Sequence, residues 1–219
     1  MIKQLAQQPG SLPFSKIINC NIGNPQQLKQ KPITFFRQVL SLLEWPEILQ
    51  HSKEASRLYP PDVIKRAKEI LKACGGSIGA YSHSKGIPYI RHHVAGFLQE
   101  RDGFPADPEH IFLTNGASEG VKAVLDTLIQ HPNCGVLIPI PQYPLYTASL
   151  ALFNATAVPY YLDEGKDWSL KASSVQASIQ KARAEGIDVR ALVVINPGNP
   201  IGNCLERKDM EEVPFFSLP

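Results

Sequence analysis

Apolar residues in the first hundred positions recur with the spacing of amphipathic helices. The i, i+3, i+4, i+7 spacing appears three times, first before and then after the Pro60-Pro61 pair. Proline suits the first turn of a helix and glycine its end, so Gly75-Gly76 and Gly103 mark where the second and third helices stop. The three predicted inner faces carry Phe36, Val39, Leu40 and Leu43; Val63, Ala67, Ile70, Leu71 and Cys74; and Ile90, Val94, Phe97, Leu98 and Arg101.

From about residue 105 the pattern changes to short apolar runs that alternate with helical stretches. Strands are predicted at 110–114, 136–138, 157–162 and 191–195, and helices at 118–129, 145–153 and 173–184. Such alternation predicts the α/β class, a mostly parallel sheet with helices on both faces, preceded by a helical N-terminal region.

These patterns divide the chain into three parts. A helical N-terminal region covers 1–104, an α/β region covers 105–213, and a divergent tail covers 214–219. Near the end, a helix is predicted from Leu205 to Val213, where Pro214 stops it.

Composition and charge disfavour some classes of function but do not identify the function of the chain. With 43% hydrophobic and 19% charged residues the chain has the composition of an ordinary globular protein. The net charge is only +2 and the basic residues are dispersed, so we expect no nucleic-acid partner. No run of 18 apolar residues and no signal-like N-terminal segment is present, so we expect no membrane association and a cytoplasmic location.

Cysteine and histidine spacing gives no metal-binding pattern. The four cysteines lie more than fifty residues apart, which fits neither a zinc site nor a disulfide scaffold. His92 and His93 are adjacent and would point to different sides of a helix, and His131 is isolated. We therefore predict no metal site.

The first predicted strand is followed by a candidate phosphate site. Ligands of parallel sheets bind at the carboxyl ends of strands, and here glycine and small residues at 114–120 open a helix. Free N–H groups at a helix start, together with the Ser118 hydroxyl, can hold a phosphate, although a plain helix cap would use the same residues. Neither GxGxxG nor GxxxxGK[ST] is matched, which disfavours a dinucleotide or triphosphate.

Two further loops complete a possible ligand site. The proline-rich stretch 139–146 could hold Tyr143 where its ring stacks on a flat ligand. The stretch 196–202 contains two Asn-Pro pairs, which either form a simple turn or fix the Asn199 amide toward a ligand. The three loops together suit one planar, phosphorylated cofactor.

These segments resemble class I pyridoxal-phosphate-dependent aminotransferases of fold type I, and the alanine aminotransferase branch in particular. The family hallmark Asn-Pro-x-Asn-Pro-Thr-Gly is matched at 196–202, except that Ile201 replaces the threonine. The stretches 101–103, 138–146 and 160–164 are similar to the alanine branch, and the similarity runs from about Phe14 to about Glu212. The fold implied is an incomplete large domain of this fold type.

The resemblance implies pyridoxal 5'-phosphate as cofactor. Ala117 and Ser118 would hold its phosphate, Tyr143 would stack on its ring, and Asn199 would bond to the ring's phenolic oxygen. The reaction implied is transamination between alanine and 2-oxoglutarate, which gives pyruvate and glutamate.

Two N-terminal residues are also matched by the resemblance. Tyr81 would reach across a homodimer interface to the phosphate in the neighbouring subunit. Gly23 would lie in the segment that closes over the amino-acid and 2-oxo-acid substrates.

No catalytic residue is assigned, because the family places its Schiff-base lysine downstream of the Asn-Pro turn and the sequence ends first. The stretch 82–85 superficially resembles that lysine's motif, but it precedes the phosphate loop, so we interpret Lys85 as an exposed loop residue. We therefore expect this chain to be inactive alone. The alternatives are an inactive truncated protein that pairs with a full-length subunit, a glutamate:glyoxylate aminotransferase, and a nucleotide-binding module, which the absent glycine motifs disfavour.

The resemblance also implies a sheet that is not laid out in chain order. Strands beyond the Asn-Pro turn would insert between earlier ones. Only the strands near Val136 and Ala157 would then remain adjacent, and the runs 111–113 and 192–195 would be left unpaired.

Overall fold

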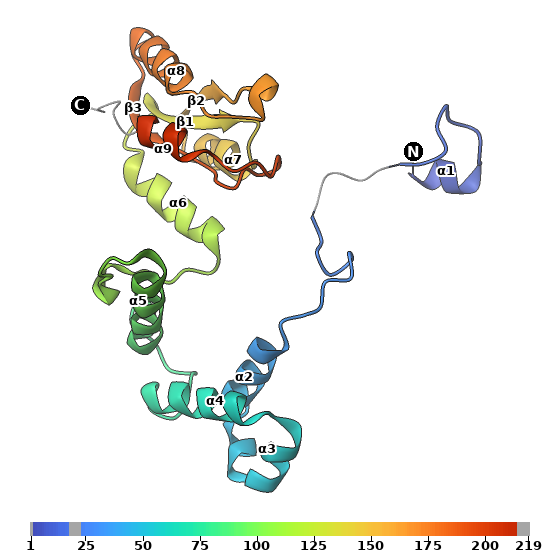
Figure 1. Ribbon diagram of the computed structural model, residues 1–219, viewed down its shortest axis with the longest axis vertical. Helices are drawn as coiled ribbons and strands as arrows, with labels where there is room; N and C mark the ends of the chain where they lie inside the picture. The colour runs from blue at the N-terminus through green and yellow to red at the C-terminus, as the bar shows by residue number, and fades with distance from the viewer. Residues whose placement is uncertain (1, 18–22, 214–219) are drawn as a thin grey trace. The chain divides into compact units, whose positions relative to one another are not determined.

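The computed structural model describes residues 2–17 and 23–213 (Figure 1). The chain splits into two compact units, Met1–Ile111 and Phe112–Pro219, and each is described by itself. The predicted tail at 214–219 lies outside the described residues. No helix of the described part is long and apolar enough to cross a membrane.

The first unit is helical. Its elements are α1 (Ile2–Gln7), α2 (Thr34–Glu44), the 3-10 helix η1 (Pro46–Gln50), α3 (Ser52–Leu58), α4 (Pro61–Ala73), α5 (Pro88–Asp102) and the 3-10 helix η2 (Pro108–His110). As predicted, α4 begins at a proline and α5 ends at Gly103, whose φ of 76° suits glycine. The first unit thus has the helical character expected from its spacing.

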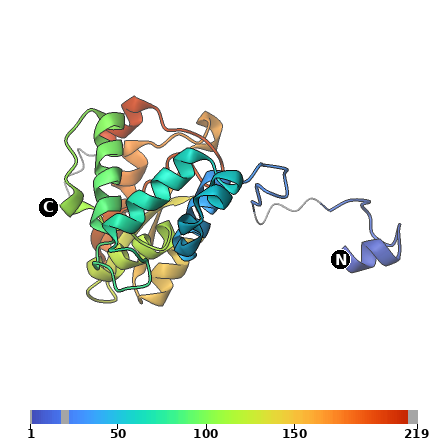
Figure 2. The ribbon, with the colours of Figure 1, turned by 90° about the horizontal axis from the view of Figure 1, so that it is seen from below.

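The core of this unit lies between α2 and α4, which pack side by side (Figure 1 and Figure 2). On α4 the predicted face is confirmed, since four of its members are buried. On α2 the prediction is partly wrong, because Phe36 and Leu40 are exposed and Leu42 is buried instead. The buried core residues are Val39, Leu42, Leu43, Val63, Ala67, Ile70 and Leu71.

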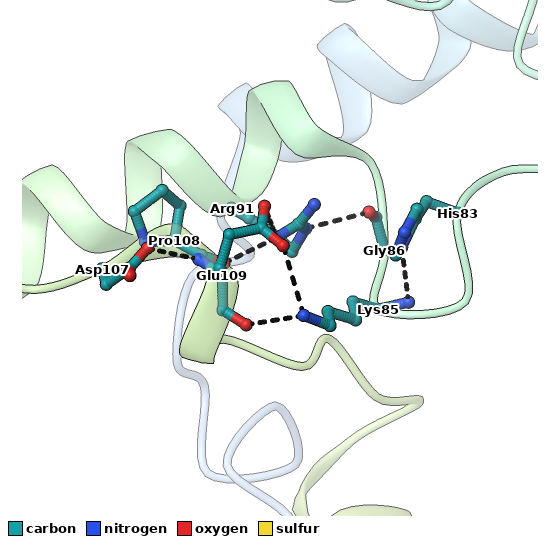
Figure 3. A network of polar contacts seen from close by, with 7 residues as sticks. All are labelled: His83, Lys85, Gly86, Arg91, Asp107, Pro108 and Glu109. Atoms are coloured by element: carbon teal, nitrogen blue, oxygen red, sulfur yellow. Dashed lines mark hydrogen bonds and ion pairs between the residues drawn. The ribbon is translucent and has the colours of Figure 1, made fainter.

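Helix α5 buries a different face from the one predicted. Phe97 is 59% exposed, whereas Arg91 is 2% exposed and Ala95 is 5% exposed. A buried guanidinium needs hydrogen-bond acceptors, and Arg91 finds three of them. Its Nε donates to Gly86 O at 3.2 Å, and its Nη1 donates to Pro108 O at 2.6 Å and Glu109 Oε1 at 2.9 Å (Figure 3). Polar contacts thus decide which face of α5 is buried, and the spacing of hydrophobic residues does not reveal such contacts.

Lys85 joins the same network. Its ammonium donates to the Glu109 carbonyl at 2.8 Å and to Glu109 Oε2 at 3.2 Å, and its side chain is only 27% exposed. The prediction of an exposed residue is therefore wrong. Arg91 and Lys85 together connect the 83–87 loop, α5 and η2 (Figure 3).

We expect this connection to loosen in acid. The hydrogen bond from Arg91, followed by that from Lys85, holds the pKa of the Glu109 carboxyl below its ordinary value. The ionised Glu109 carboxylate therefore stabilises the folded unit fully above the unfolded-state pKa of about 4.3. This stabilisation is lost as the pH falls through the lower folded-state pKa of Glu109. Hydrogen exchange of the segment 105–111, corrected for intrinsic rates, should accelerate over that range. The variant Glu109→Gln should abolish this acceleration at low pH. The control Glu100→Gln, on an exposed side of α5, should show it unchanged. An acceleration that persists in Glu109→Gln would contradict its assignment to Glu109.

The second unit is an α/β sandwich. Its elements are α6 (Ala117–Leu128), β1 (Cys134–Ile140), α7 (Leu145–Leu152), β2 (Thr156–Tyr161), the 3-10 helix η3 (Glu164–Lys166), α8 (Ala172–Ala184), β3 (Asp188–Leu192) and α9 (Arg207–Glu212). The sheet has the order β2-β1-β3 with both pairs parallel. The predicted alternation of strands and helices is confirmed in this unit from α6 to β3.

Helices cover both faces of this sheet, as the sequence predicted (Figure 1). Because successive side chains of a strand point to opposite faces, Leu137 packs with α8 while Val136 and Ile138 pack with α6 and α7. All three are at most 1% exposed. The central strand β1 is therefore apolar on both sides.

Two strand predictions are wrong. Residues 110–114 form no strand; His110 ends η2 and the following residues lead into α6. The last strand runs from Asp188 to Leu192, earlier than 191–195, and it pairs with β1 through Leu137 and Leu192. The run 192–195 is thus not left unpaired, since Val193 N also donates to Leu137 O at 2.8 Å. Pairing with β1 gives backbone groups of β3 the hydrogen-bond partners that they would otherwise lack.

Candidate cofactor site

The loop before α6 has the form of an anion site. Gly116 precedes the helix at φ 78° and gives it no side-chain cap, so the N–H groups of Ala117 and Ser118 begin the helix without intrahelical partners. Two side chains fix the loop: Thr114 Oγ1 donates to Gly116 O at 2.9 Å, and Glu119 Oε2 accepts from Asn115 N at 2.8 Å. Ser118 is exposed, which leaves its hydroxyl open to a ligand.

The loop after β1 presents an aromatic ring. Tyr143 is 44% exposed and lies between Pro141 and the start of α7. Next to it, Gln142 Nε2 donates to Thr147 Oγ1 at 3.2 Å, while Gln142 Oε1 is buried without a hydrogen-bond partner. A buried acceptor without a partner is rare in proteins, so Gln142 Oε1 is a group that a ligand of this loop could satisfy.

The loop after β3 forms a closed turn around Asn199. Gly198 N donates to Asn203 O at 2.8 Å and Gly202 N donates to Gly198 O at 2.7 Å. A Cβ at position 198 would lie 2.2 Å from Asn203 Oδ1, so a larger residue there would displace the Asn203 side chain. Asn199 itself is exposed, and its amide is held on this turn where a ligand can reach it.

Tyr160 fixes the start of the same loop. Its hydroxyl donates to Val193 O at 2.7 Å, across the sheet from β2 to the residue that follows β3. Tyr160 is 1% exposed, and this burial raises its pKa, so the hydroxyl stays protonated and keeps donating. Sequence inspection did not assign this role, because it depends on which strands are neighbours.

The structure brings the second and third loops to one edge of the sheet. Since β1 and β3 run parallel, their carboxyl ends lead into Tyr143 and Asn199 at the same edge. A pocket of about 10 Å³, room for about one water, is lined there by residues that include Pro141, Asn199 and Asn203. A ring-sized ligand would therefore lie on the open edge.

Helix α6 carries the candidate phosphate loop at its start. Its C-terminal end leads into the start of β1, and Val121 and Leu125 pack near Val136 and Ile138. The helix therefore runs antiparallel to β1, and its N-terminus with Ser118 is directed toward the carboxyl ends of the strands. Exposed N–H groups, an aromatic ring and an amide are the groups that a planar phosphorylated ligand would need.

The two remaining predicted residues lie in the first unit. Tyr81 is fully exposed, in the loop that Arg91 and Lys85 hold. Gly23 is exposed, with no atom within 4 Å of the place where a Cβ would stand, and its neighbours 18–22 are outside the described residues. Their assigned roles stay predictions.

The fold is a parallel α/β sheet whose candidate ligand loops follow the carboxyl ends of its strands, and comparisons with known proteins identify the family. The pattern of the family described as "Aminotransferase class I and II" matches residues 50–216, most of the chain. The chain belongs to this family.

Relatives and solved structures agree with that assignment. The chain is 52% identical over 216 residues, 99% of its length, to "Probable alanine aminotransferase, mitochondrial" of Dictyostelium discoideum. It is 50% identical over 201 residues, 92% of its length, to "Glutamate--glyoxylate aminotransferase 1" of Arabidopsis thaliana. The crystal structure of an aminotransferase from Escherichia coli, 24% identical, matches with a TM-score of 0.65 over 96% of this chain and 42% of its own, and shows the fold.

The matched proteins are much longer than this chain. It spans 40% of the Dictyostelium relative and 42% of the Arabidopsis relative. The family assignment therefore holds for the matched part alone.

Proposed function

We propose that this chain supplies the cofactor-binding front part of a pyridoxal-phosphate-dependent alanine aminotransferase. The observation that carries the proposal is the exposed Tyr143 ring and the exposed Asn199 residue in the loops that follow the parallel strands β1 and β3, and the uncapped N-terminus of α6 supports it. The name of the Dictyostelium relative supports alanine as the amino donor. The reaction would transfer its amino group to 2-oxoglutarate.

Each site residue has a distinct task in this proposal. The N–H groups of Ala117 and Ser118 and the Ser118 hydroxyl bind the cofactor phosphate at the positive end of α6. Tyr143 stacks on the ring and Asn199 forms a hydrogen bond with the ring oxygen. Pyridoxal phosphate, when bound, supplies the electron sink for the amino-group transfer.

Partners and location follow from the same proposal. A homodimer would let Tyr81 of one protomer reach the phosphate site of its partner. We propose a cytoplasmic location; the name of the Dictyostelium relative includes "mitochondrial", so imaging of a tagged protein provides the test.

The activity is tested with a chimera. Residues 1–213 of this chain replace the matching part of the Dictyostelium relative, which then supplies the family's lysine. A folded chimera should transfer the amino group of alanine to 2-oxoglutarate at a rate within about tenfold of the parent relative. A folded, cofactor-bound chimera that lacks this activity would refute the proposal.

Glutamate:glyoxylate transamination is the second candidate, because the Arabidopsis relative bears that name at similar identity. The same chimera, assayed with glutamate and glyoxylate, ranks the two reactions by kcat/KM. A larger value for glyoxylate would replace the first proposal by the second.

Ser118→Ala should weaken cofactor binding in the chimera by about 1.5–3 kcal/mol, because a hydrogen bond to a charged phosphate is lost. Ser173→Ala is the matched control, since Ser173 is also the second residue of a helix, α8, and is also exposed. Fluorescence titration with pyridoxal phosphate measures both. Equal affinities for the two variants would show that Ser118 does not hold the phosphate.

A further inference from the structure

Three possible metal ligands meet at the edge of the sheet opposite the cofactor loops. Each of His131, Cys134 and Asp188 offers one ligand atom, and the three atoms lie within 4.8 Å of one another. His131 Nε2 is 3.4 Å from Asp188 Oδ2. Cys134 is fully buried, Asp188 is partly buried and His131 is exposed, so the sulfur lies beneath the two harder ligands.

The backbone fixes this arrangement. His131 and Cys134 are joined by a turn in which Cys134 N donates to His131 O at 3.0 Å. Asp188 is the register partner of Cys134 in the parallel pair β1 and β3, and its N–H donates to Asn133 O at 2.9 Å. Strand pairing therefore brings a distant carboxylate to the turn, which sequence spacing could not indicate.

We propose that His131, Cys134 and Asp188 bind a divalent cation of the zinc class. Zinc binds thiolate, imidazole and carboxylate ligands at about 2.0–2.3 Å with tetrahedral geometry, which places neighbouring ligand atoms somewhat over 3 Å apart. The 3.4 Å between His131 Nε2 and Asp188 Oδ2 matches that separation. A water would take the fourth position, and the Cys134 thiol would release its proton to solvent as the thiolate binds.

The nature of the ligands selects the ion. Sulfur and imidazole nitrogen favour zinc and its analogue cobalt(II), whereas magnesium and calcium require oxygen ligands. Arg190 sets the orientation of the carboxylate, because its Nε donates to Asp188 Oδ2 at 2.6 Å. The Arg190 charge opposes the cation, so affinity depends on all three ligands.

Cobalt(II) titration of the 219-residue chain tests the site directly. Binding through Cys134 should produce thiolate-to-cobalt charge-transfer absorption in the near ultraviolet, and zinc should displace it while magnesium should not. Cys134→Ser, His131→Gln and Asp188→Asn should each weaken binding at least about tenfold, since even loss of an outer-shell partner of a metal costs about 10–100-fold. Cys204→Ser and His51→Gln, which change exposed residues elsewhere, should not. Charge-transfer absorption that survives Cys134→Ser would overturn the proposal.

Protection of the thiol gives a second measurement that needs no variant. A buried cysteine reacts with an alkylating reagent when its surroundings open, and a ligand at about ten times its Kd slows such opening by about tenfold. Mass spectrometry should therefore show about tenfold slower alkylation of Cys134 with zinc, and an unchanged rate for the exposed Cys204. Equal Cys134 rates with and without zinc would also overturn the proposal. Neither measurement depends on pyridoxal phosphate or on transamination.

Discussion

The 219-residue chain, purified alone and supplied with pyridoxal phosphate, should transfer the amino group of alanine to 2-oxoglutarate at less than about a hundredth of the rate of the Dictyostelium relative. Proton transfer by a positioned side chain contributes about 10²–10⁴-fold in enzymes, and this family assigns it to a lysine downstream of the Asn-Pro turn. No described lysine of the second unit is placed to substitute. Lys171 pairs with Asp163 and Lys208 pairs with Glu206, and the others, Lys122, Lys166 and Lys181, lie on α6, η3 and α8.

Lys85 deserves a separate test, because its sequence context resembles the motif of the family lysine. Its ammonium already donates to the Glu109 carbonyl and carboxylate, and this keeps it within the network of the first unit. A coupled assay for pyruvate formation measures the rate, with the chimera as positive control. Activity of the isolated chain that Lys85→Arg abolishes would show that the family lysine is replaced by Lys85.

The isolated chain should also self-associate. Each unit, taken alone, exposes large apolar side chains to water, and contiguous exposed apolar area promotes association. Strands β2 and β3 are both sheet edges, which can pair with another chain. The sequence predicts unpaired edges at 111–113 and 192–195. Because 110–114 form no strand and β3 pairs with β1, exposed apolar side chains are the main cause of self-association. Those more than half exposed include Phe36, Leu40, Trp45, Leu58, Phe97, Phe104, Phe112, Leu152 and Tyr161.

Light scattering coupled to size exclusion measures the effect over a range of concentrations. The mean mass should exceed that of a 24.2 kDa monomer and should rise with concentration. Trp45→Glu with Phe97→Glu should lower it, because two exposed apolar side chains gain charge. Lys65→Glu, on the exposed side of α4, is the control for a charge change without loss of apolar area. A monomer with a sharp cooperative thermal transition would contradict this prediction.

Hydrophobic periodicity predicted the parts of the fold in which burial is purely apolar. It located α4 and its buried face, and it located β1 and the helices on both sides of it. It failed on α5, where Arg91 is buried because acceptors from Gly86 and η2 surround it. Such contacts join residues distant in sequence, so an apolar pattern contains no sign of them.

The candidate sites divide in the same way. Tyr143 and Asn199 follow from loop chemistry, because β1 and β3 are parallel and their carboxyl ends share an edge, whereas the strand expected before Ser118 does not form. The Asp188 carboxylate reaches His131 and Cys134 only through the register of β1 and β3, which single-sequence analysis cannot supply. Neither the sheet nor the metal site could be fully predicted, because strand order and register cannot be inferred from this sequence alone.

The hydrogen bond from Tyr160 to Val193 gives Tyr160 two roles on which selection can act: its ring packs in the core, and its hydroxyl holds the loop that leads to Asn199. Phenylalanine at position 160 would keep the ring within the apolar core but would leave the Val193 carbonyl, at the entrance to the Asn199 turn, without its donor. Loss of that donor would cost folding stability and would also loosen the turn that presents Asn199, so selection for folding and selection for a fixed Asn199 both act on the hydroxyl, whereas selection for folding alone acts on the ring. Among descendants of this gene, phenylalanine at position 160 would therefore mark lineages in which both kinds of selection on the hydroxyl have weakened.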